Sequence, residues 1–384
     1  MPEVLILGAG VIGTSIAFHL ASRGVTDVAV LDRGSVGEGG SGRSSALIRM
    51  HYTFAPEVRL AVTSLEYFRN WRHIVGRPGT FRQTGFVRLV GPGESERLWR
   101  NVAMQRELGV EVEVVAPDGL RALVPGWNVD DVELAAYEPG SGYGDGAATA
   151  GDFLARAREI GVDYRPSTRV RSIRIHDGRV AGVETDRGAV DAPVVVVAAG
   201  PWSPPLLSSA GVGLPIEPEF HVVAVLRMGE GSGDPGLACI DSVTATYLRP
   251  EGQGLALVGD FSGERGSDPD AFPDRAPEEA LVELVGRASR RVPALAEAGL
   301  AGGVTGVYDM TPDARPLLGR VGPDGLLVAA GFSGMGFKIS PAVGLGMAEL
   351  ILDGEARSVD LASFDPMRFE RGRPIEAEFE YAQD

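Results

Sequence analysis

Hydrophobic positions at the start of the 384-residue chain predict a strand, a glycine turn, a helix and a second strand. The apolar run Val4–Leu7 suits a buried strand, and an amphipathic stretch follows it through Ser22. A second apolar run covers Val28–Leu31. Two parallel strands joined by a helix form a right-handed βαβ unit, the building block of dinucleotide-binding sheets.

The pattern further along the chain predicts two domains that alternate in the sequence. Continuous apolar runs at residues 194–198 and 325–332 are typical of buried parallel strands. Alternating runs at residues 168–175 and 179–185 indicate a hairpin, and residues 216–260 have a strand-like pattern. We therefore expect a dinucleotide-binding domain of residues 1–80, 145–215 and 305–365, a second antiparallel domain of residues 81–144 and 216–304, and a C-terminal tail of residues 366–384.

Composition narrows the classes of partner. The chain has 52 acidic and 36 basic residues, and the resulting net charge of −16 disfavours nucleic acid because phosphate would be repelled. No apolar run reaches the ~18 residues of a membrane helix. The single cysteine, Cys239, excludes a disulfide framework and multi-cysteine metal sites, so we expect a cytoplasmic protein. The five histidines have no metal-ligand spacing, and no metal is expected.

Lys338 is the only lysine among the 36 basic residues. A bias toward arginine explains the other 35, but it does not explain why this position kept a lysine. Lysine is a compact point charge whose pKa moves on burial, and arginine does not share these properties. The sequence therefore makes Lys338 a candidate site residue, with a chance surface lysine as the alternative.

Three glycines at the first predicted strand–helix turn have the GxGxxG spacing of dinucleotide sites. Gly8 permits a tight turn, Gly10 lets the backbone approach a pyrophosphate, and Gly13 allows the helix to pack on the strand. Asp32 follows at the end of the next predicted strand, where an acid hydrogen-bonds ribose hydroxyls and disfavours a 2′-phosphate. The pattern predicts FAD or NAD, and the alternative is a βα turn without a ligand.

Two further glycine-rich turns are candidates for ligand contact. Residues 37–45, GEGGSGRSS, hold a second GxGxxG match, and their serines and Arg43 can bind phosphate; a flexible surface loop is the alternative. Residues 333–338, SGMGFK, join a predicted strand to a predicted helix beginning near Ser340. Backbone amides face a ligand in such turns, although an ordinary strand–helix turn is the alternative.

Four motifs in order make the whole chain similar to the D-amino-acid-oxidase-like FAD superfamily. They are GAGVIGTSIAFHLASRG with Asp32, GGSGRSSALIRMHY, VVVVAAGPWS, and MTPDARPLLG followed by GLLVAAGFSGMGFKISPAVG. The chain resembles most closely the branch of sarcosine oxidase, glycine oxidase, and sarcosine or dimethylglycine dehydrogenases. This resemblance implies an α/β plus α+β protein of the glutathione-reductase-2 type, with a Rossmann-type FAD-binding domain and an antiparallel-sheet substrate domain.

The resemblance also implies which residues contact FAD. Asp32 would bind the adenosine ribose, Val170 would meet the adenine through its backbone, and residues 334–338 would lie against the isoalloxazine ring. The implied cofactor-binding residues are Gly8, Gly10, Val11, Ile12, Gly13, Asp32, Arg33, Ser41, Gly42, Arg43, Ser44, Ser45, Ala46, Val170, Ala199, Gly200, Trp202, Phe332, Gly334, Met335, Gly336, Phe337 and Lys338.

The same resemblance implies a substrate site. Arg49 and Lys338 stand at positions that bind the substrate carboxylate in the sarcosine-oxidase branch, and a buried carboxylate needs such paired cations. Tyr52, Tyr247 and Tyr308 stand at aromatic site positions of that branch. We expect these five residues to form the catalytic site.

Three positions depart from the family pattern. Gly306 replaces the cysteine that tethers flavin in monomeric sarcosine oxidases, and Ser44 replaces the flavin-bearing histidine of dimethylglycine dehydrogenases. Non-covalent FAD is therefore expected, with His51 as a remote alternative anchor. Ala256 aligns roughly with the lysine that promotes oxygen reduction, which favours a dehydrogenase over an oxidase.

The resulting hypothesis is an FAD enzyme that oxidises the carbon–nitrogen bond of an amino acid, N-alkylated or cyclic, by hydride transfer to flavin N5. Oxygen, a quinone or an electron-transfer protein would accept the electrons, and an oligomer is compatible with the sequence. Oxidation of a D-amino acid or glycine is one alternative. The other is an FAD-bearing subunit of a heteromeric complex with little activity alone.

Overall fold

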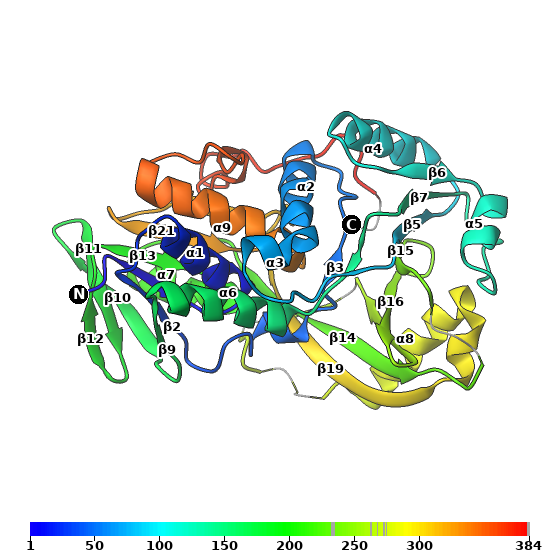
Figure 1. Cartoon of the computed structure of the whole chain (residues 1–384), viewed down its shortest axis with the longest axis horizontal. Coiled ribbons are helices and arrows are strands. Elements are labelled where there is room, and N and C mark those ends of the chain that lie inside the picture. Colours follow the sequence, from blue (N-terminus) through cyan, green and yellow to red (C-terminus); the bar gives the residue numbers. More distant parts are fainter. Residues whose placement is uncertain (232–234, 262, 267, 272, 274, 382–384) are drawn as a thin grey trace.

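The computed structural model describes residues 1–231, 235–261, 263–266, 268–271, 273 and 275–381. Its first domain contains a six-stranded sheet in the order β20–β21–β13–β1–β2–β9 (Figure 1). All neighbours are parallel except β20 and β21. The strands are β1 (Val4–Leu7), β2 (Val28–Leu31), β9 (Asp163–Arg165), β13 (Val194–Val197), β20 (Leu317–Arg320) and β21 (Leu326–Ala330).

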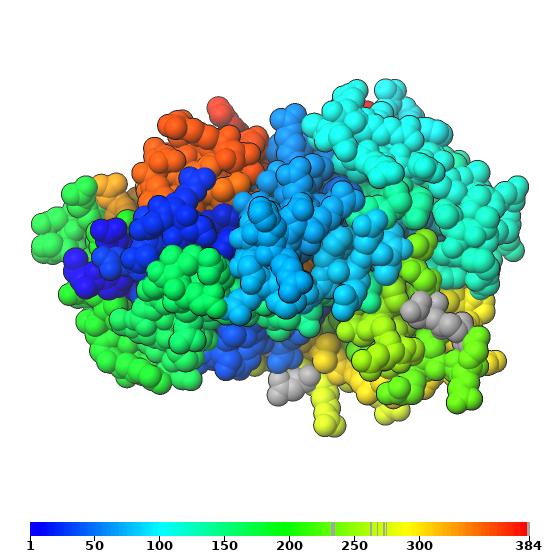
Figure 2. All heavy atoms as spheres, in the orientation of Figure 1, coloured from blue at the N-terminus to red at the C-terminus, as the bar shows by residue number. Residues whose placement is uncertain are grey.

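Helices cover one face of this sheet and a small sheet covers the other. Helices α1 (Val11–Ser22), α6 (Gly146–Ile160) and α9 (Gly336–Asp353) lie side by side (Figures 1 and 2). On the opposite face, Leu5 and Leu7 belong to one hydrophobic cluster with residues of a three-stranded antiparallel sheet. That sheet contains β10 (Val170–His176), β11 (Arg179–Thr185) and β12 (Gly188–Asp191). Because both faces are covered, the central strands are apolar throughout.

The second domain is built on a sheet with nine described strands, and among these only β5 and β15 pair in parallel. Its longest pair is β14 with β19, and the two strands form the long lower edge of the molecule in Figure 1. The strands are β5 (Phe86–Val90), β6 (Glu113–Val115), β7 (Leu134–Glu138), β14 (Glu217–Arg227), β15 (Ala238–Asp241), β16 (Thr246–Gly252), β17 (Leu255–Asp260), β18 (Glu264–Arg265) and β19 (Gly299–Met310).

Short elements connect the two domains and cover the second sheet. A three-stranded sheet of β3 (Leu47–Ile48), β8 (Gly142–Tyr143) and β4 (Arg82–Gln83) lies where the chain passes between them. The remaining helices are α2 (Ala55–Arg69), α3 (Trp71–Ile74), α4 (Ser95–Glu107), α5 (Pro117–Leu123), α7 (Ser203–Ser209) and α8 (Glu278–Arg291).

The predicted fold class is confirmed, with a Rossmann-type sheet domain and a second, mainly antiparallel domain. One strand was missed and one helix boundary was wrong. The 12-residue strand β19 was not predicted, because Gly302, Gly303 and Gly306 interrupt its alternating pattern. Helix α9 begins at Gly336 and not near Ser340, so Lys338 lies in the first helical turn and not in the preceding loop.

Candidate active site

The first glycine turn joins β1 to α1 and excludes side chains for steric reasons. Gly8 has φ +114°, and an added Cβ would overlap the carbonyl oxygen of Ala198 in the neighbouring strand–helix turn. A Cβ on Gly13 would overlap the carbonyl oxygen of Gly8. Both positions therefore require glycine, and they bring α1 close to the end of β1.

The glycine–serine loop meets the start of helix α1. Ser41 Oγ accepts a hydrogen bond from the Val11 backbone amide at 3.0 Å. Gly10 is the N-cap and has no side chain that could bond to the amides that follow it. The first backbone N–H groups of a helix attract anions, so this is where a pyrophosphate would bind.

Asp32 is held at the end of β2 by two backbone amides. Its Oδ2 accepts from Ala9 N at 2.7 Å, and its Oδ1 accepts from Gly34 N at 2.8 Å. These bonds fix the carboxylate beside the first glycine turn. A ribose bound next to the helix start would find this acceptor already oriented.

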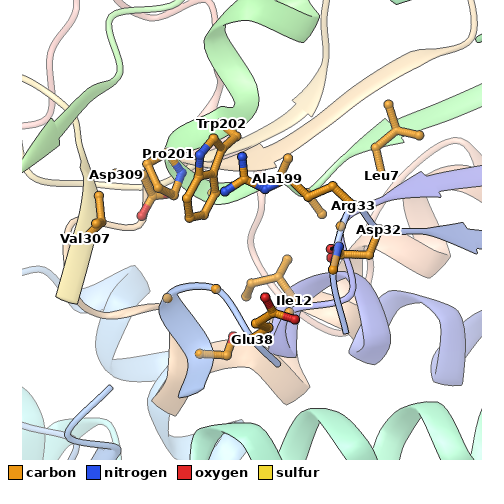
Figure 3. A pocket seen from close by; sticks show the side chains of 18 of the residues that line it. Leu7, Ile12, Asp32, Arg33, Glu38, Ala199, Pro201, Trp202, Val307 and Asp309 are labelled. Carbon is orange, nitrogen blue, oxygen red and sulfur yellow. Dashed lines mark hydrogen bonds between the residues drawn. The ribbon is translucent and has the colours of Figure 1, made fainter. Parts of the chain in front are cut away.

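These elements line a cavity of about 860 Å³ at the carboxyl ends of the parallel strands (Figure 3). In Figure 3, Asp32 and Leu7 mark one end, and Val307 and Asp309 on β19 mark the other. The structure places most of the predicted cofactor residues on the wall: Gly8, Gly10, Val11, Ile12, Asp32, Arg33, Ser41, Arg43, Ser44, Val170, Ala199, Gly200, Trp202, Phe332, Gly334, Gly336 and Phe337.

Six predicted cofactor residues do not line this cavity. Gly13 packs against Gly8, and the Gly42 amide donates to the Gly37 carbonyl oxygen at 2.7 Å. Both residues therefore stabilise the conformation of a glycine turn without lining the cavity. The other four are buried and do not reach the wall: Ser45, Ala46, Met335 and Lys338.

Several lining residues were missed from the sequence. Arg169, Arg171 and Asp186 belong to or adjoin the β10–β11 hairpin, where only Val170 was singled out. Glu38 lies in the glycine–serine loop 37–45, of which only the serines and Arg43 were considered, and Asp309 is the last residue but one of β19. No sequence motif marks Asp309 or the hairpin residues, because the pairing of distant strands brings them to the cavity.

Arg33 and Trp202 form a stacked pair on the cavity wall. The guanidinium carbon of Arg33 lies 4.3 Å from the Trp202 ring centroid. Asp270 joins both, since Arg33 donates to its two oxygens at 2.8 and 2.7 Å and Trp202 Nε1 donates at 2.8 Å. Three distant segments thus meet at this wall.

Asp309 fixes the turn that precedes α9. Its Oδ2 accepts from the Gly331 amide at 2.7 Å, and its backbone oxygen accepts from the Ser333 amide at 3.0 Å. Burial raises the pKa of the Asp309 carboxyl to about 6, although the backbone amides that donate to it oppose this rise.

Two of the three tyrosines predicted for the site, Tyr247 and Tyr308, lie beside the same turn. Tyr308 lines the cavity, and an added Cβ on Gly334 would lie 2.6 Å from its ring. Tyr247 is hydrogen-bonded to Tyr308, and burial raises the pKa of both phenols. On its far side Tyr308 stacks on His221, with ring centroids 4.0 Å apart. His221 was not predicted as a site residue.

Arg49 and Lys338 are brought together from opposite ends of the sequence. Lys338 Nζ donates to the Gly334 carbonyl oxygen at 3.3 Å, and Arg49 donates from Nη1 to the carbonyl oxygen of His51. Burial and the nearby Arg49 guanidinium lower the pKa of Lys338 well below its usual range, against the attraction of Glu57. Among the described residues, neither cation forms an ion pair with a carboxylate.

Buried acids and Tyr52 surround Arg49. The Tyr52 ring lies 4.3 Å from the Arg49 guanidinium carbon, and burial raises the pKa of its phenol. Glu57 is fully buried with Arg315 Nε 3.1 Å from its Oε1, and burial raises the pKa of Glu57 to about 7. Glu138 accepts from the Met50 amide at 2.9 Å, and burial also raises its pKa.

Four other residues singled out from the sequence are placed as follows. Gly306 faces His221 across the β14–β19 pair, and Ala256 is fully buried in the core of the second domain. The His51 ring bonds to Tyr381 and does not line the cavity. Cys239 is fully buried, as expected of a small apolar residue.

Together the two glycine turns, the start of helix α1, the oriented Asp32 and the cavity that they line fit FAD, and they define a two-domain dinucleotide-binding oxidoreductase. The chain belongs to the FAD dependent oxidoreductase family, whose model matches residues 3–350. It is FAD-dependent, as the sequence predicted. In the part of the chain that is described, no helix is long and apolar enough to cross a membrane, and no acids, histidines or cysteines group as a metal site.

Three relatives illustrate this family. The chain is 28% identical to human mitochondrial sarcosine dehydrogenase, covering 96% of this chain and 41% of that protein. It is also 28% identical to the sarcosine oxidase subunit beta of Rhizobium meliloti, and the match covers 99% of this chain and 91% of that protein. The solved structure of L-proline dehydrogenase from P. horikoshii is 29% identical, with a TM-score of 0.89 over 97% of this chain and 99% of that one.

Proposed function

We propose that this protein oxidises the carbon–nitrogen bond of an amino acid or N-alkyl amino acid, sarcosine- or proline-like, to an imine. The observation that carries the proposal is the meeting of Arg49 and Lys338 beside the 333–338 turn, where, among the described residues, both donate to backbone carbonyls and neither pairs with a carboxylate. The enzymes named among the relatives act on such substrates, which supports the proposed class.

The two cations would bind the substrate carboxylate. Lys338 lies in the first turn of α9, and this turn contains no acidic residue. The positive end of the helix dipole therefore adds to the positive potential of the Lys338 and Arg49 side chains. In this buried setting a carboxylate would replace weak carbonyl partners by charge-assisted hydrogen bonds, which Arg49 can make in pairs. The carboxylate would also restore the counter-charge that Lys338 lacks.

The surroundings would favour the neutral form of the substrate amine. Burial and nearby cations both lower the pKa of an amine, and the site offers both. Tyr247 and Tyr308 would form the aromatic wall that orients the reacting carbon, without a histidine base. When bound, FAD supplies the acceptor for the hydride of that carbon.

We further infer that FAD is held non-covalently. We also infer that a quinone or an electron-transfer protein accepts the electrons in preference to oxygen. Gly306 has no side chain that could form a bond to flavin. Ala256, which aligns roughly with the lysine that promotes oxygen reduction in sarcosine oxidases, provides no cation for this step.

The test is an absorbance spectrum of the purified protein before and after acid precipitation, followed by anaerobic addition of sarcosine, proline, glycine and a D-amino-acid panel. We expect a flavin spectrum that moves to the supernatant and bleaches with a secondary amino acid. Bleaching by glycine or a D-amino acid alone would replace the proposed substrate class with the alternative. Absence of bleaching by every amino acid would overturn the proposal.

A second candidate function is the FAD-bearing subunit of a heteromeric complex. The relative named as a sarcosine oxidase subunit, matched over 91% of its length, favours this alternative. Turnover of the isolated chain with an artificial acceptor would exclude it. Bleaching by substrate without any turnover would support it.

A further inference from the structure

Residues 375–381, here called the C-terminal segment, connect both domains to the predicted carboxylate site. In Figure 1 the red end of the chain passes over α2 toward the second domain. The Ile375 amide donates to Asp313 Oδ2 at 2.9 Å in the first domain. Asn101 Nδ2, on α4, donates to the Phe379 carbonyl oxygen at 2.9 Å. The segment is therefore anchored to both domains, and its last residues contact the loop 50–54, which follows Arg49.

Tyr381 reaches Arg49 through one intermediate residue. The Tyr381 side chain is 3% exposed, and its hydroxyl lies 2.8 Å from His51 Nε2, with the two rings stacked. Burial, together with Arg88 and Arg49, lowers the pKa of His51 well below its usual range, so the ring is neutral. The carbonyl oxygen of the same His51 accepts the hydrogen bond from Arg49. Fixing this ring therefore fixes the partner of the Arg49 guanidinium.

Glu380 reaches the same site by a second route. Its carboxylate pairs with Arg315 and accepts from Thr53 Oγ1 at 3.2 Å. Arg315 also donates to Thr53 Oγ1 at 3.1 Å, and its Nε lies 3.1 Å from Glu57. Glu57 is the acid whose charge acts on both Arg49 and Lys338.

We propose that Glu380 and Tyr381 are positioning residues of the substrate site, acting on Arg49 through His51 and through the Thr53–Arg315–Glu57 cluster. This role rests on the proposed carboxylate-binding function. Tyr381 makes a buried contact with the loop 50–54 and Glu380 makes a partly buried one, and the same loop carries Tyr52. Neither lines the cavity, so their loss changes carboxylate binding and leaves FAD binding intact.

The experiment titrates the FAD-loaded enzyme with sodium propionate, a carboxylate without an amine, and follows the flavin absorbance. The variants are Tyr381→Phe and Glu380→Gln. Tyr67→Phe is the control for the first, because Tyr67 makes an equivalent hydroxyl–imidazole contact of 3.2 Å with His19 elsewhere. Glu378→Gln is the control for the second, because Glu378 is exposed on the same segment.

We expect each variant to bind propionate about three- to tenfold more weakly than wild type, the effect of one hydrogen bond. The variants should raise KM more than they lower kcat for an oxidised substrate, with FAD content and Tm equal to those of the controls. Propionate that binds Tyr381→Phe and Glu380→Gln as tightly as wild type overturns the positioning role alone. Propionate that leaves the wild-type spectrum unchanged overturns the proposed function, and the positioning role with it.

Discussion

The ammonium nitrogen of Lys338 lies 3.3 Å from the carbonyl oxygen of Gly334, in the turn immediately before helix α9. A lysine in the first turn of a helix opposes the helix dipole, and burial adds to this cost. The chain retains a cation in this unfavourable position, beside Arg49 and with a lowered pKa. Such an arrangement is stabilised when an anion binds, which is the basis of the first prediction.

Lys338→Met should raise KM for the amino-acid substrate by about 100-fold or more, because removing one partner of a buried ion pair costs ~3–5 kcal/mol. FAD content should not change, since Lys338 does not line the cofactor cavity. Steady-state kinetics measure KM, and the flavin absorbance spectrum measures the FAD content. Arg59→Met, on an exposed position of α2, is the control. Equal KM values for Lys338→Met and wild type would remove Lys338 from the site.

Gly8→Ala should destabilise the folded protein by ~3 kcal/mol or more and abolish FAD binding. The new Cβ would combine a positive φ with overlap of a backbone oxygen that cannot move aside. Gly24→Ala separates the two effects, because Gly24 also has a positive φ, of +88°, but no atom lies within 4 Å of its added Cβ. Urea denaturation should show a loss of only ~1 kcal/mol for this control. Similar losses in the two variants would contradict the steric argument.

Asp32→Ala should weaken FAD binding by about 10- to 100-fold, since a hydrogen bond to a charged group contributes ~1.5–3 kcal/mol. Removing the carboxylate also deprives the Ala9 and Gly34 amides of the acceptor that orients the turn. Titration of the apoprotein with FAD, followed by flavin fluorescence, measures the dissociation constant. Asp27→Ala, at an exposed position before β2, should match wild type. Unchanged affinity in Asp32→Ala would show that the ribose lies elsewhere.

Glu57 should make the protein less stable as pH rises from about 4.5 to about 7. Its pKa is raised from 4.5 to about 7 in the folded state, so over this range the folded protein holds a proton that the unfolded chain releases. The expected loss is on the order of 3 kcal/mol, complete above pH 7. Denaturation of Glu57→Gln at pH 5 and pH 8 should lack this component, whereas Glu66→Gln, exposed on α2, should retain it. Equal pH dependence in Glu57→Gln and wild type would contradict the assignment.

The sequence by itself determined the parts of the protein that depend on local chemistry. The β1–α1–β2 unit, the glycines of its turn and Asp32 could be predicted, because the spacing of apolar residues and glycine dictates backbone geometry within some thirty residues. Lys338 could be singled out because it is the only lysine. The FAD-dependent family could be predicted from four motifs in order, and the match over residues 3–350 confirms it.

Only the tertiary structure decided which distant residues meet. Arg49 and Lys338 are 289 positions apart in the sequence, and they come together because β3 and α9 pack against each other. Asp309 reaches the cavity through strand β19, whose glycines conceal its pattern and whose stability comes from pairing with β14. Glu380 and Tyr381 belong to no motif, since their contact with the loop 50–54 follows from the path of the whole chain and not from any local preference.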